Sequence, residues 1–584
     1  MREALTGREL SREEVWREAG VVAARLAGRG IGTGDVVALD LNRSADLIVA
    51  ALGVVRAGAA YLPVDGQAPT DRVAAILHDA RVAAIIVGRG EGYRDRPLGT
   101  DAGVPVLTIA DGDDPYGALD TPDVTVADDA PLCVGYTSGS TGVPKGVVVP
   151  HSAVHDLVAD TAQPGAITSG DRVGQLANPA FDAFTWEVWG ALTTGAPLIV
   201  LPTVVETDLE RWAGLLVAER ISTALLTTSL FHMVAREAPA ALGSLRQLLV
   251  GGEQMDLAAT ERVLAAGGPA LLLNIYGPTE TTVFVTTFTC TPRTLAGRTR
   301  IPIGQPVRRV RLHVLDEEMR PVAPGETGEL CVGGPSVTSG YLHNPERTGR
   351  SYVTYTAHDG ATGTIYRTGD RVRQLPDGQY EVVGRADRQV KLRGFRIELE
   401  EIEQAAVATG RTEAAFVEKH GEGHTARLVG AFLRPAGSGE AAAGELAAAL
   451  AEQLPAYMLP ALWVPLAELP FGSTGKADRA RIKSVLAEAA EAAVTTPAAA
   501  EEPAATTPAG TVVAEVWAEL LGLPGSSAVQ ATDDFIGLGG NSILATQAAF
   551  RIGERLGIRL DPTDVLLTPS FAELADQLGR ASKV

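Results

Sequence analysis

Short apolar runs alternate with helical segments from residue 1 to about residue 380. Runs such as VVALDLN, AAIIVGR, LIVLP and LRQLLVGGE have the length and composition of strands buried on both faces. Each is followed by a segment of helical periodicity, for example AATERVLAAGG. This alternation predicts an α/β architecture with mostly parallel sheets.

The pattern changes beyond this region. From about residue 388, strand-like AAFVEKH and LVGAFLRP precede helical GELAAALAEQL. Residues 488–510 are biased toward Ala, Pro, Thr and Glu, cannot bury apolar surface, and predict a flexible linker. Residues 511–584 show helical periodicity again (VVAEVWAELLG, SILATQAAFRIGERLG, SFAELADQLG), which predicts a small helical bundle on a tether.

Length and charge narrow the class of protein. A chain of 584 residues corresponds to three or four structural units. Its net charge of -21 argues against nucleic acid as a partner, since phosphate backbones need a basic face. The N-terminus is charged, and the most apolar stretch, residues 47–62, is broken by Arg56 and too short to span a bilayer. With three scattered cysteines, the sequence indicates a cytoplasmic protein without a membrane partner or a disulfide framework.

A glycine- and serine-rich loop, YTSGSTGVPKG at residues 136–146, is the sharpest local motif. Glycines let a backbone approach a phosphate, hydroxyls add donors, and a lysine adds positive charge. The Walker spacing is absent, and a Gly/Ser run taken alone would more often be a flexible surface loop, so the flanking motifs decide in favour of phosphate binding. The candidate phosphate-binding residues are Thr137, Ser138, Gly139, Ser140, Thr141, Gly142 and Lys145.

Further motifs follow the loop in a fixed order. They are NIYGPTE (274–280), YRTGD (366–370), GRADR (384–388), KLRGFRIE (391–398) and GK (475–476). The series resembles the adenylation domains of nonribosomal peptide synthetases, within the larger family of adenylate-forming enzymes. The resemblance runs from Leu5 to about Arg479 and includes RAGAAYLPVD and GELCVGGPSVTSGYLHNP. It implies a large α/β core formed by residues 1–386 and a small, mobile α+β subdomain formed by residues 387–487.

The resemblance implies a role for each residue of the nucleotide site. Tyr276 is expected to stack on adenine, and Asp370 to accept hydrogen bonds from the ribose hydroxyls, since a carboxylate is an acceptor only. Thr279 and the glycine-rich loop are expected to contact the phosphates of ATP, and Arg385 to lie near the ribose or phosphates. Glu280 is expected to help hold Mg²⁺, a cation that prefers oxygen ligands.

The same resemblance assigns catalysis to Lys476. This lysine would bridge the substrate carboxylate and the α-phosphate, where a preplaced cation stabilises developing charge. Asp387 would be the hinge on which the small subdomain rotates after adenylation, and residues 391–397 would then be presented for thioester formation.

The segment FDAFTWE at residues 181–187 resembles the part of the family that recognises the substrate amino group. Asp182 would pair with the ammonium, a contact that a simple fatty acid could not make. The side-chain pocket would comprise Ala183, Trp186, Leu225, Leu249, Gly251, Ile275, Val283 and Phe284. Because all are apolar, with Gly251 and Ala183 making room, we expect an apolar amino acid, leucine first, then isoleucine, valine or an aromatic residue.

The second signature is DFIGLGGNSIL at residues 534–544. It resembles a peptidyl carrier domain, a four-helix bundle in which Ser542 carries a 4′-phosphopantetheine arm. A helix start suits a phosphodiester, because free backbone N–H groups and the helix dipole favour negative charge. Residues 511–584 would form this domain, and Asn541 departs from the His or Asp more familiar before the serine.

These features together predict a free-standing adenylation–carrier didomain for natural product biosynthesis. No His-His pair or G-x-S-x-G motif occurs, so the sequence shows neither a condensation nor a thioesterase signature. Expected partners are an amino acid with ATP and Mg²⁺, a phosphopantetheinyl transferase, a downstream condensation or tailoring enzyme in trans, and an MbtH-like protein. Two alternatives stay open: an acyl- or aryl-CoA ligase, and a catalytically inactive docking protein.

Overall fold

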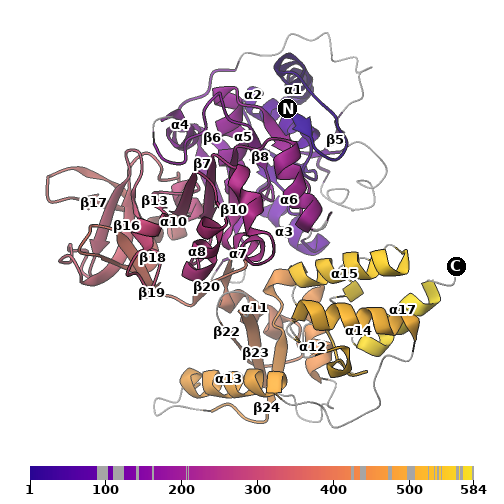
Figure 1. The fold of residues 1–584 in the computed structure, drawn as a ribbon. Coiled ribbons are helices and arrows are strands. Elements are labelled where there is room, and N and C mark those ends of the chain that lie inside the picture. Colours follow the sequence, from indigo (N-terminus) through magenta and orange to yellow (C-terminus); the bar gives the residue numbers. More distant parts are fainter. Residues whose placement is uncertain are drawn as a thin grey trace. The chain divides into compact units, whose positions relative to one another are not determined.

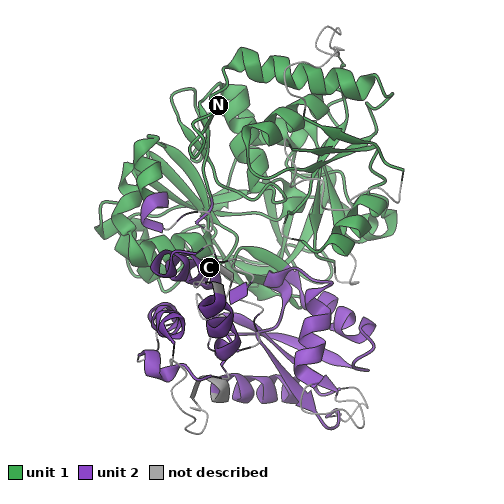
Figure 2. Cartoon of the chain, turned by 90° about the vertical axis from the view of Figure 1, so that its right-hand side faces the viewer, with its two compact units in different colours: residues 1–139, 143–202, 213–396 green, residues 140–142, 203–212, 397–584 purple. Residues whose placement is uncertain are grey.

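The structure is a computed structural model in which two compact units are distinguished (Figures 1 and 2). Unit 1 comprises residues 1–139, 143–202 and 213–396, and unit 2 comprises residues 140–142, 203–212 and 397–584. The residues that the structure describes are 1–66, 68–88, 103–109, 124–139, 144–160, 163–204, 207, 209–421, 426–433, 442–470, 477–495, 507–521, 523, 525–531, 533–535, 538, 540, 542–558, 560, 564–565, 568 and 570–581.

An eight-stranded sheet forms the centre of unit 1. Its strands, in spatial order, are β1 (Arg2–Glu3), β9 (Leu198–Val200), β8 (Val173–Gln175), β10 (Thr223–Thr227), β11 (Gln247–Gly251), β12 (Leu271–Tyr276), β13 (Thr286–Thr289) and β14 (Gln305–Pro306). The pairing is parallel from β1 to β12 and antiparallel beyond it. The accompanying helices are α4 (His151–Ala159), α5 (Ala183–Thr194), α6 (Leu209–Ala218), α7 (Thr228–Glu237) and α8 (Leu257–Ala265).

A second, six-stranded sheet has the order β5-β4-β2-β3-β6-β7 and is parallel except at β7. Its strands are β2 (Val36–Asp40), β3 (Ala60–Pro63), β4 (Ala84–Val87), β5 (Val106–Thr108), β6 (Pro131–Thr137) and β7 (Lys145–Pro150), and its helices are α1 (Arg12–Ala27), α2 (Ala45–Arg56) and α3 (Thr70–Asp79). Ser11 and Glu14 form a capping box that begins α1. Gly53 lets α2 approach α1, because a Cβ at Gly53 would lie 2.5 Å from Val22 Cβ.

The third sheet of unit 1 is entirely antiparallel, which corrects the expectation of mostly parallel sheets up to residue 380. The pairs β15–β16, β17–β18 and β18–β19 join strands that are neighbours in sequence, and antiparallel neighbours need no crossover helix. The strands are β15 (Arg311–Leu315), β16 (Thr327–Gly333), β17 (Tyr352–Thr356), β18 (Thr362–Gln374) and β19 (Tyr380–Arg385). The helix α10 (Pro345–Ser351) precedes β17, and the two-stranded sheet β20 (Gln389–Leu392) and β21 (Phe395–Glu398) follows.

The small subdomain of unit 2 is a three-stranded sheet with helices. It contains α11 (Leu399–Ala408), β22 (Ala415–His420), β23 (Arg427–Leu433), α12 (Ala442–Ala451), β24 (Leu462–Leu466) and α13 (Arg479–Thr495). The predicted linker therefore begins too early, because α13 continues to Thr495. Alanine and glutamate are strong helix formers, and Ala490 is fully buried against Phe416 and Ile482, so this part of the segment has apolar surface to bury.

The carrier segment contains α14 (Pro508–Leu521), α15 (Ser542–Leu556) and α17 (Phe571–Ala581), with a short 3₁₀ helix at Ser526–Ala528. Its core is built on Trp517, whose ring centroid lies 5.1 Å from that of Phe535 and 5.6 Å from that of Phe571. The predicted helical bundle is thus present, and α14 begins at Pro508, within the predicted linker.

The three cysteines are buried and free. Within the described ranges, helices long and apolar enough to cross a membrane are absent, as are clusters of three or more His, Cys, Asp or Glu side chains that could hold a metal ion.

We expect Ala490→Glu to weaken the end of α13, because an unpaired charge would replace a methyl group that is 0% exposed. The local opening free energy of residues 479–495, measured by hydrogen exchange on the full chain, should fall by about 2 kcal/mol or more. Lys483→Glu, on an exposed position of the same helix, is the matched control and should change it little. Equal effects of the two variants would contradict the packing of Ala490.

Candidate active site

The parallel strands of the central sheet bring three segments to one edge. Thr227, Gly251 and Ile275 are paired in register at the carboxyl ends of β10, β11 and β12. In an open α/β sheet, ligands bind at the carboxyl ends of the strands, because the following loops converge there. The segment after β12 carries Thr279 and Glu280, in a short 3₁₀ helix.

Glu280 is the most enclosed charged group at this edge. Its Oε1 lies 3.1 Å from Lys145 Nζ and accepts a hydrogen bond of 2.9 Å from Tyr341 OH. Its Oε2 accepts a hydrogen bond of 2.6 Å from Arg396 Nη1. The Glu280 side chain is 0% exposed. It forms ion pairs with two cations, Lys145 and Arg396, that come from distant parts of the sequence.

The charge state of Glu280 follows from these partners. Burial by itself would raise the pKa of Glu280, but Arg396 and Lys145 outweigh it and hold this pKa well below its usual range. The carboxylate is consequently ionised at neutral pH, and the two cations beside it are paired.

Residues 389–396, including the turn between β20 and β21, lie in the site within unit 1. The Gly394 N–H donates to Glu253, and Lys391 Nζ lies 4.9 Å from the centroid of the Tyr276 ring. Ser138 Oγ donates a 2.6 Å hydrogen bond to the carbonyl oxygen of Arg396. This packing explains why the compact units divide between residues 396 and 397, ten residues beyond the predicted domain boundary at 386/387.

Three of the predicted nucleotide residues are linked by hydrogen bonds. Tyr276 OH donates to Asp370 Oδ2 over 2.5 Å, and Arg385 Nη1 donates to Asp370 Oδ1 over 2.8 Å. Arg385 also donates from Nε and Nη2 to the two oxygens of Asp387, over 2.6 and 2.7 Å. Asp370 is buried, and each of its oxygens accepts one side-chain hydrogen bond within the described part of the chain, fewer than the roughly four lone-pair sites of a carboxylate allow.

Asp182 lies immediately before α5, near enough to Glu280 for the two carboxylates to interact electrostatically. Burial raises the pKa of Asp182 to about 6, the nearby charge of Glu280 adds to the shift, and a hydrogen bond with the Thr279 side chain opposes it. The predicted ammonium partner and the predicted phosphate contact are therefore neighbours.

The predicted pocket residues are arranged in two rows across the central sheet. Leu225 pairs with Leu249, which pairs with Leu273, and Gly251 pairs with Ile275 two residues further along. Residues at i and i+2 point to the same face of a strand, so both rows share one face. Trp186, Val283 and Phe284 are buried in the same core cluster, with Ala183 packed against it.

Two details of this pocket differ from what the sequence predicts. Gly251 was expected to make room, but a Cβ there would lie 2.7 Å from Ile275 Cγ1, so Ile275 takes up the space. Gly165 and Leu273, which are absent from the predicted set, lie beside the predicted pocket residues Leu249 and Phe284. A Cβ at Gly165 would be 3.5 Å from Leu273 Cδ1 and 3.7 Å from Phe284 Cζ.

Several predicted residues lie outside the described residues or are only partly described. Ser140, Thr141, Gly142 and Lys476 lie outside them. Ser542 is the first residue of α15. Conversely, the sequence assigns no role to Glu253 or Tyr341 and assigns Arg396 only as part of the segment 391–397. The available signals were the strand-like run LRQLLVGGE, which ends at Glu253, and the recognised motif SGYLHNP, which contains Tyr341.

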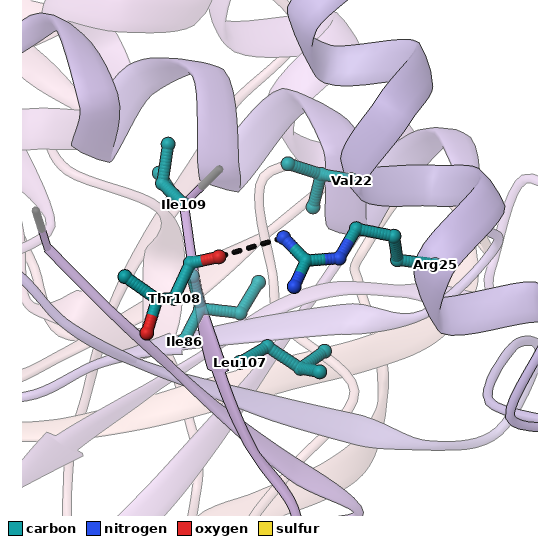
Figure 3. Close-up of a pocket in the computed structure, with 6 residues that line it drawn as sticks. All are labelled: Val22, Arg25, Ile86, Leu107, Thr108 and Ile109. Atoms are coloured by element: carbon teal, nitrogen blue, oxygen red, sulfur yellow. Dashed lines mark hydrogen bonds between the residues drawn. The ribbon is translucent and has the colours of Figure 1, made fainter. Parts of the chain in front are cut away.

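A separate pocket lies between α1 and the strands β4 and β5 (Figure 3). It is lined by Val22, Arg25, Ile86, Leu107, Thr108 and Ile109, and Arg25 Nη1 donates to the Thr108 carbonyl over 2.6 Å. It contains none of the predicted site residues and is mainly apolar, so it is not part of the candidate active site.

The α/β sheets, the buried Glu280 with its cations, and the C-terminal helices define an adenylate-forming ligase fused to a carrier domain. The model of the AMP-binding enzyme family matches residues 2–342, and that of the phosphopantetheine attachment site matches residues 511–578. The chain therefore belongs to the AMP-binding enzyme family, and it combines a nonribosomal peptide synthetase adenylation domain with a peptidyl carrier domain, as the sequence predicts.

Curated relatives and solved structures match nearly the whole chain. The chain is 37% identical over 567 residues to malpibaldin synthetase of Mortierella alpina, covering 95% of this chain and 10% of that protein. It is 34% identical over 586 residues to surfactin synthase subunit 3 of Bacillus subtilis (strain 168), covering 98% and 44%. The chain thus spans less than half the length of these two curated relatives. The structure of holo-PA1221, described as an NRPS protein containing adenylation and PCP domains bound to a vinylsulfonamide inhibitor, matches with a TM-score of 0.80 and 25% identity, covering 99% of this chain and 93% of that chain.

We expect Glu280→Gln to destabilise unit 1, because it removes the buried carboxylate charge that pairs with Lys145 and Arg396. The free energy of unfolding should fall by about 3–5 kcal/mol at pH 7. Because the pKa of Glu280 is held low in the folded state, this difference should persist down to about pH 4.3 and shrink only below it. Glu346→Gln, in an exposed pair with Arg350, is the control in the same denaturant titrations and should cost about 1 kcal/mol or less.

Proposed function

We propose that this chain uses ATP to adenylate an amino acid and then transfers the aminoacyl group to a phosphopantetheine arm on its own carrier domain. The observation that carries the proposal is the position of Asp182 beside Thr279 and Glu280. An amino acid held through its ammonium at Asp182 would place its carboxylate toward the residues that contact phosphate. A fatty or aryl acid has no ammonium to pair with the Asp182 carboxylate, which disfavours the CoA-ligase alternative.

The residues present fit ATP and Mg²⁺. Asp370 has acceptor capacity for the ribose hydroxyls, and Tyr276 offers a ring for adenine once Lys391 leaves the face that it covers. Glu280 would hold Mg²⁺ together with phosphate oxygens, and the metal would supply neutralisation of phosphate charge. Both oxygens of Glu280 are already ion-paired. Mg²⁺ would therefore have to replace Arg396 as a partner of this carboxylate.

Lys476 and Asp387 complete the proposed reaction cycle. Lys476 would stabilise the charge that develops as the carboxylate attacks the α-phosphate. Asp387, held by Arg385 in this arrangement, would be the hinge that withdraws Lys476 and brings residues 391–397 into place. The packing of Lys391 and Gly394 against Tyr276 and Glu253 supports this second arrangement.

Ser542 is the proposed attachment point of 4′-phosphopantetheine. It begins a helix of 15 residues, where backbone N–H groups favour a phosphodiester. The bound arm would supply the thiol that accepts the aminoacyl group. A phosphopantetheinyl transferase would install it, a condensation or tailoring enzyme would receive the product in trans, and an MbtH-like protein is a further proposed partner.

The proposed substrate has an apolar side chain, with leucine first and isoleucine, valine or an aromatic residue as alternatives. Leu225, Leu249 and Ile275 present apolar surface on one face of the sheet. A charged side chain would leave polar groups unpaired in such a pocket and would be rejected.

Mass spectrometry of the intact protein tests the whole proposal. After treatment with a phosphopantetheinyl transferase and CoA, then with ATP, Mg²⁺ and leucine, we expect one pantetheine adduct followed by one aminoacyl increment. Ser542→Ala should lose both increments and keep amino-acid-dependent pyrophosphate exchange. Lys476→Ala should lower that exchange by about a hundred- to a thousandfold and leave ATP binding in place.

The outcomes separate the alternatives. Aminoacyl-CoA formed from free CoA by the Ser542→Ala variant would favour a CoA ligase. Tight ATP binding without exchange for any of the apolar amino acids would favour an inactive docking protein. Near-normal exchange by Lys476→Ala would contradict the catalytic role of this lysine.

The pH dependence of exchange should report the ionisation of Asp182. Since burial raises the pKa of Asp182 to about 6, kcat/KM for the amino acid should fall about tenfold per pH unit below that value, because the protonated carboxyl cannot pair with the ammonium. The KM for ATP should stay nearly constant over the same range. Asp182→Asn should lower kcat/KM by about 30-fold or more at pH 8 and abolish this acidic limb. An unchanged limb in the variant would assign the titration to another group.

A further inference from the structure

Arg308 is a buried cation behind one of the predicted pocket residues. It lies between β14 and β15, and its side chain is 2% exposed, whereas that of the adjacent Arg309 is 74% exposed. Both arginines face Asp156 on α4, with Arg309 Nη2 at 2.8 Å and Arg308 Nε at 3.6 Å. One carboxylate therefore serves two cations, and the buried one has the longer contact.

Arg308 holds both the main chain and the ring of Phe284. Its Nη2 donates to the Phe284 carbonyl oxygen, and its guanidinium carbon lies 4.9 Å from the centroid of the Phe284 ring. The backbone at Arg308 has a φ of 54°, a left-handed conformation that a long side chain rarely adopts. The surrounding structure thus maintains a costly backbone conformation that directs this side chain at Phe284.

The bond to Phe284 is difficult for Arg308 to exchange for another. Burial lowers the pKa of Arg308 to about 10, which leaves it charged at neutral pH. Its Nε and Nη1 make no hydrogen bond to any residue that the structure describes. A buried guanidinium with few acceptors keeps those it has, because an unpaired charged donor is costly in a low dielectric.

A second segment, the loop at Gly165, also lies close to the Phe284 ring. A Cβ at Gly165 would lie 3.7 Å from Phe284 Cζ and 3.4 Å from Leu249 Cδ2. Gly165 has a φ of 87°, so its loop passes close to the ring in a conformation that favours glycine. The Phe284 ring therefore has two neighbours, the Gly165 loop near its Cζ atom and the guanidinium of Arg308 near its centroid.

We propose that Arg308 is a positioning residue that sets the depth of the amino-acid pocket by fixing Phe284. This inference rests on the proposed function, in which Phe284 lines that pocket. With Phe284 fixed, side chains that fit in front of the ring are accepted, and larger side chains that require the ring to withdraw are rejected. Arg308 itself does not contact the substrate.

The experiment is amino-acid-dependent pyrophosphate exchange by the full chain with valine, leucine and phenylalanine separately. Arg308→Met removes the donors and keeps most of the volume, and Arg308→Lys keeps the charge without the planar fork. Arg309→Met is the matched control, because it loses the same Asp156 partner from an exposed position. We expect Arg308→Met to raise the kcat/KM ratio of phenylalanine to leucine about tenfold or more, Arg308→Lys to give an intermediate ratio, and Arg309→Met to leave it unchanged, with the KM for ATP within about twofold throughout.

An equal fall for all three amino acids, or an unchanged ratio in both Arg308 variants, would overturn the positioning role. Arg308→Lys provides the readout if Arg308→Met does not fold. If the wild-type chain shows no exchange with any of the three amino acids, the proposed function fails and the inference fails with it. If the wild-type chain is active and only the ratio stays unchanged, the inference about Arg308 fails alone.

Discussion

The ion-paired carboxylate of Glu280 is the interaction on which the site depends. A fully buried charge is tolerated only with partners, and Glu280 obtains them from Lys145 and Arg396, which lie 135 residues before it and 116 residues after it in sequence. Tyr341 adds a hydrogen bond to the same carboxylate. This one group therefore joins the hairpin of β6 and β7, the edge of the central sheet and the segment that precedes the small subdomain.

The arrangement around Glu280 also decides what the rest of the site can do. With Arg396 in place, residues 389–396 pack against Tyr276 and Glu253, and the nucleotide residues bond one another. In the proposed reaction these contacts must be exchanged for ATP and regained for thioester formation. The carboxylate is suited to both situations, because it keeps its charge and only its counter-ions change.

The proposed amino-acid pocket depends on a different constraint, the register of parallel strands. Pairing of Leu225 with Leu249 and of Gly251 with Ile275 fixes which side chains share a face. Phe284 follows β12 on an irregular segment that no ladder fixes, and its carbonyl and ring are held by Arg308 instead. The proposed specificity therefore depends both on the register of the parallel strands and on the irregular segment that carries Phe284.

The sequence by itself determined the fold class and the carrier domain and supplied most of the candidate site residues, because periodicity is a local property and the motifs lie in short segments. It did not determine the extent of α13, where Ala490 helps to form a buried face, or the antiparallel sheet, which lacks the helical alternation. Only the tertiary structure decided that Arg396 meets Glu280, that Ile275 fills the space at Gly251, and that Arg308 lies behind Phe284. These contacts join residues distant in sequence, and their geometry follows from packing rather than from any local pattern.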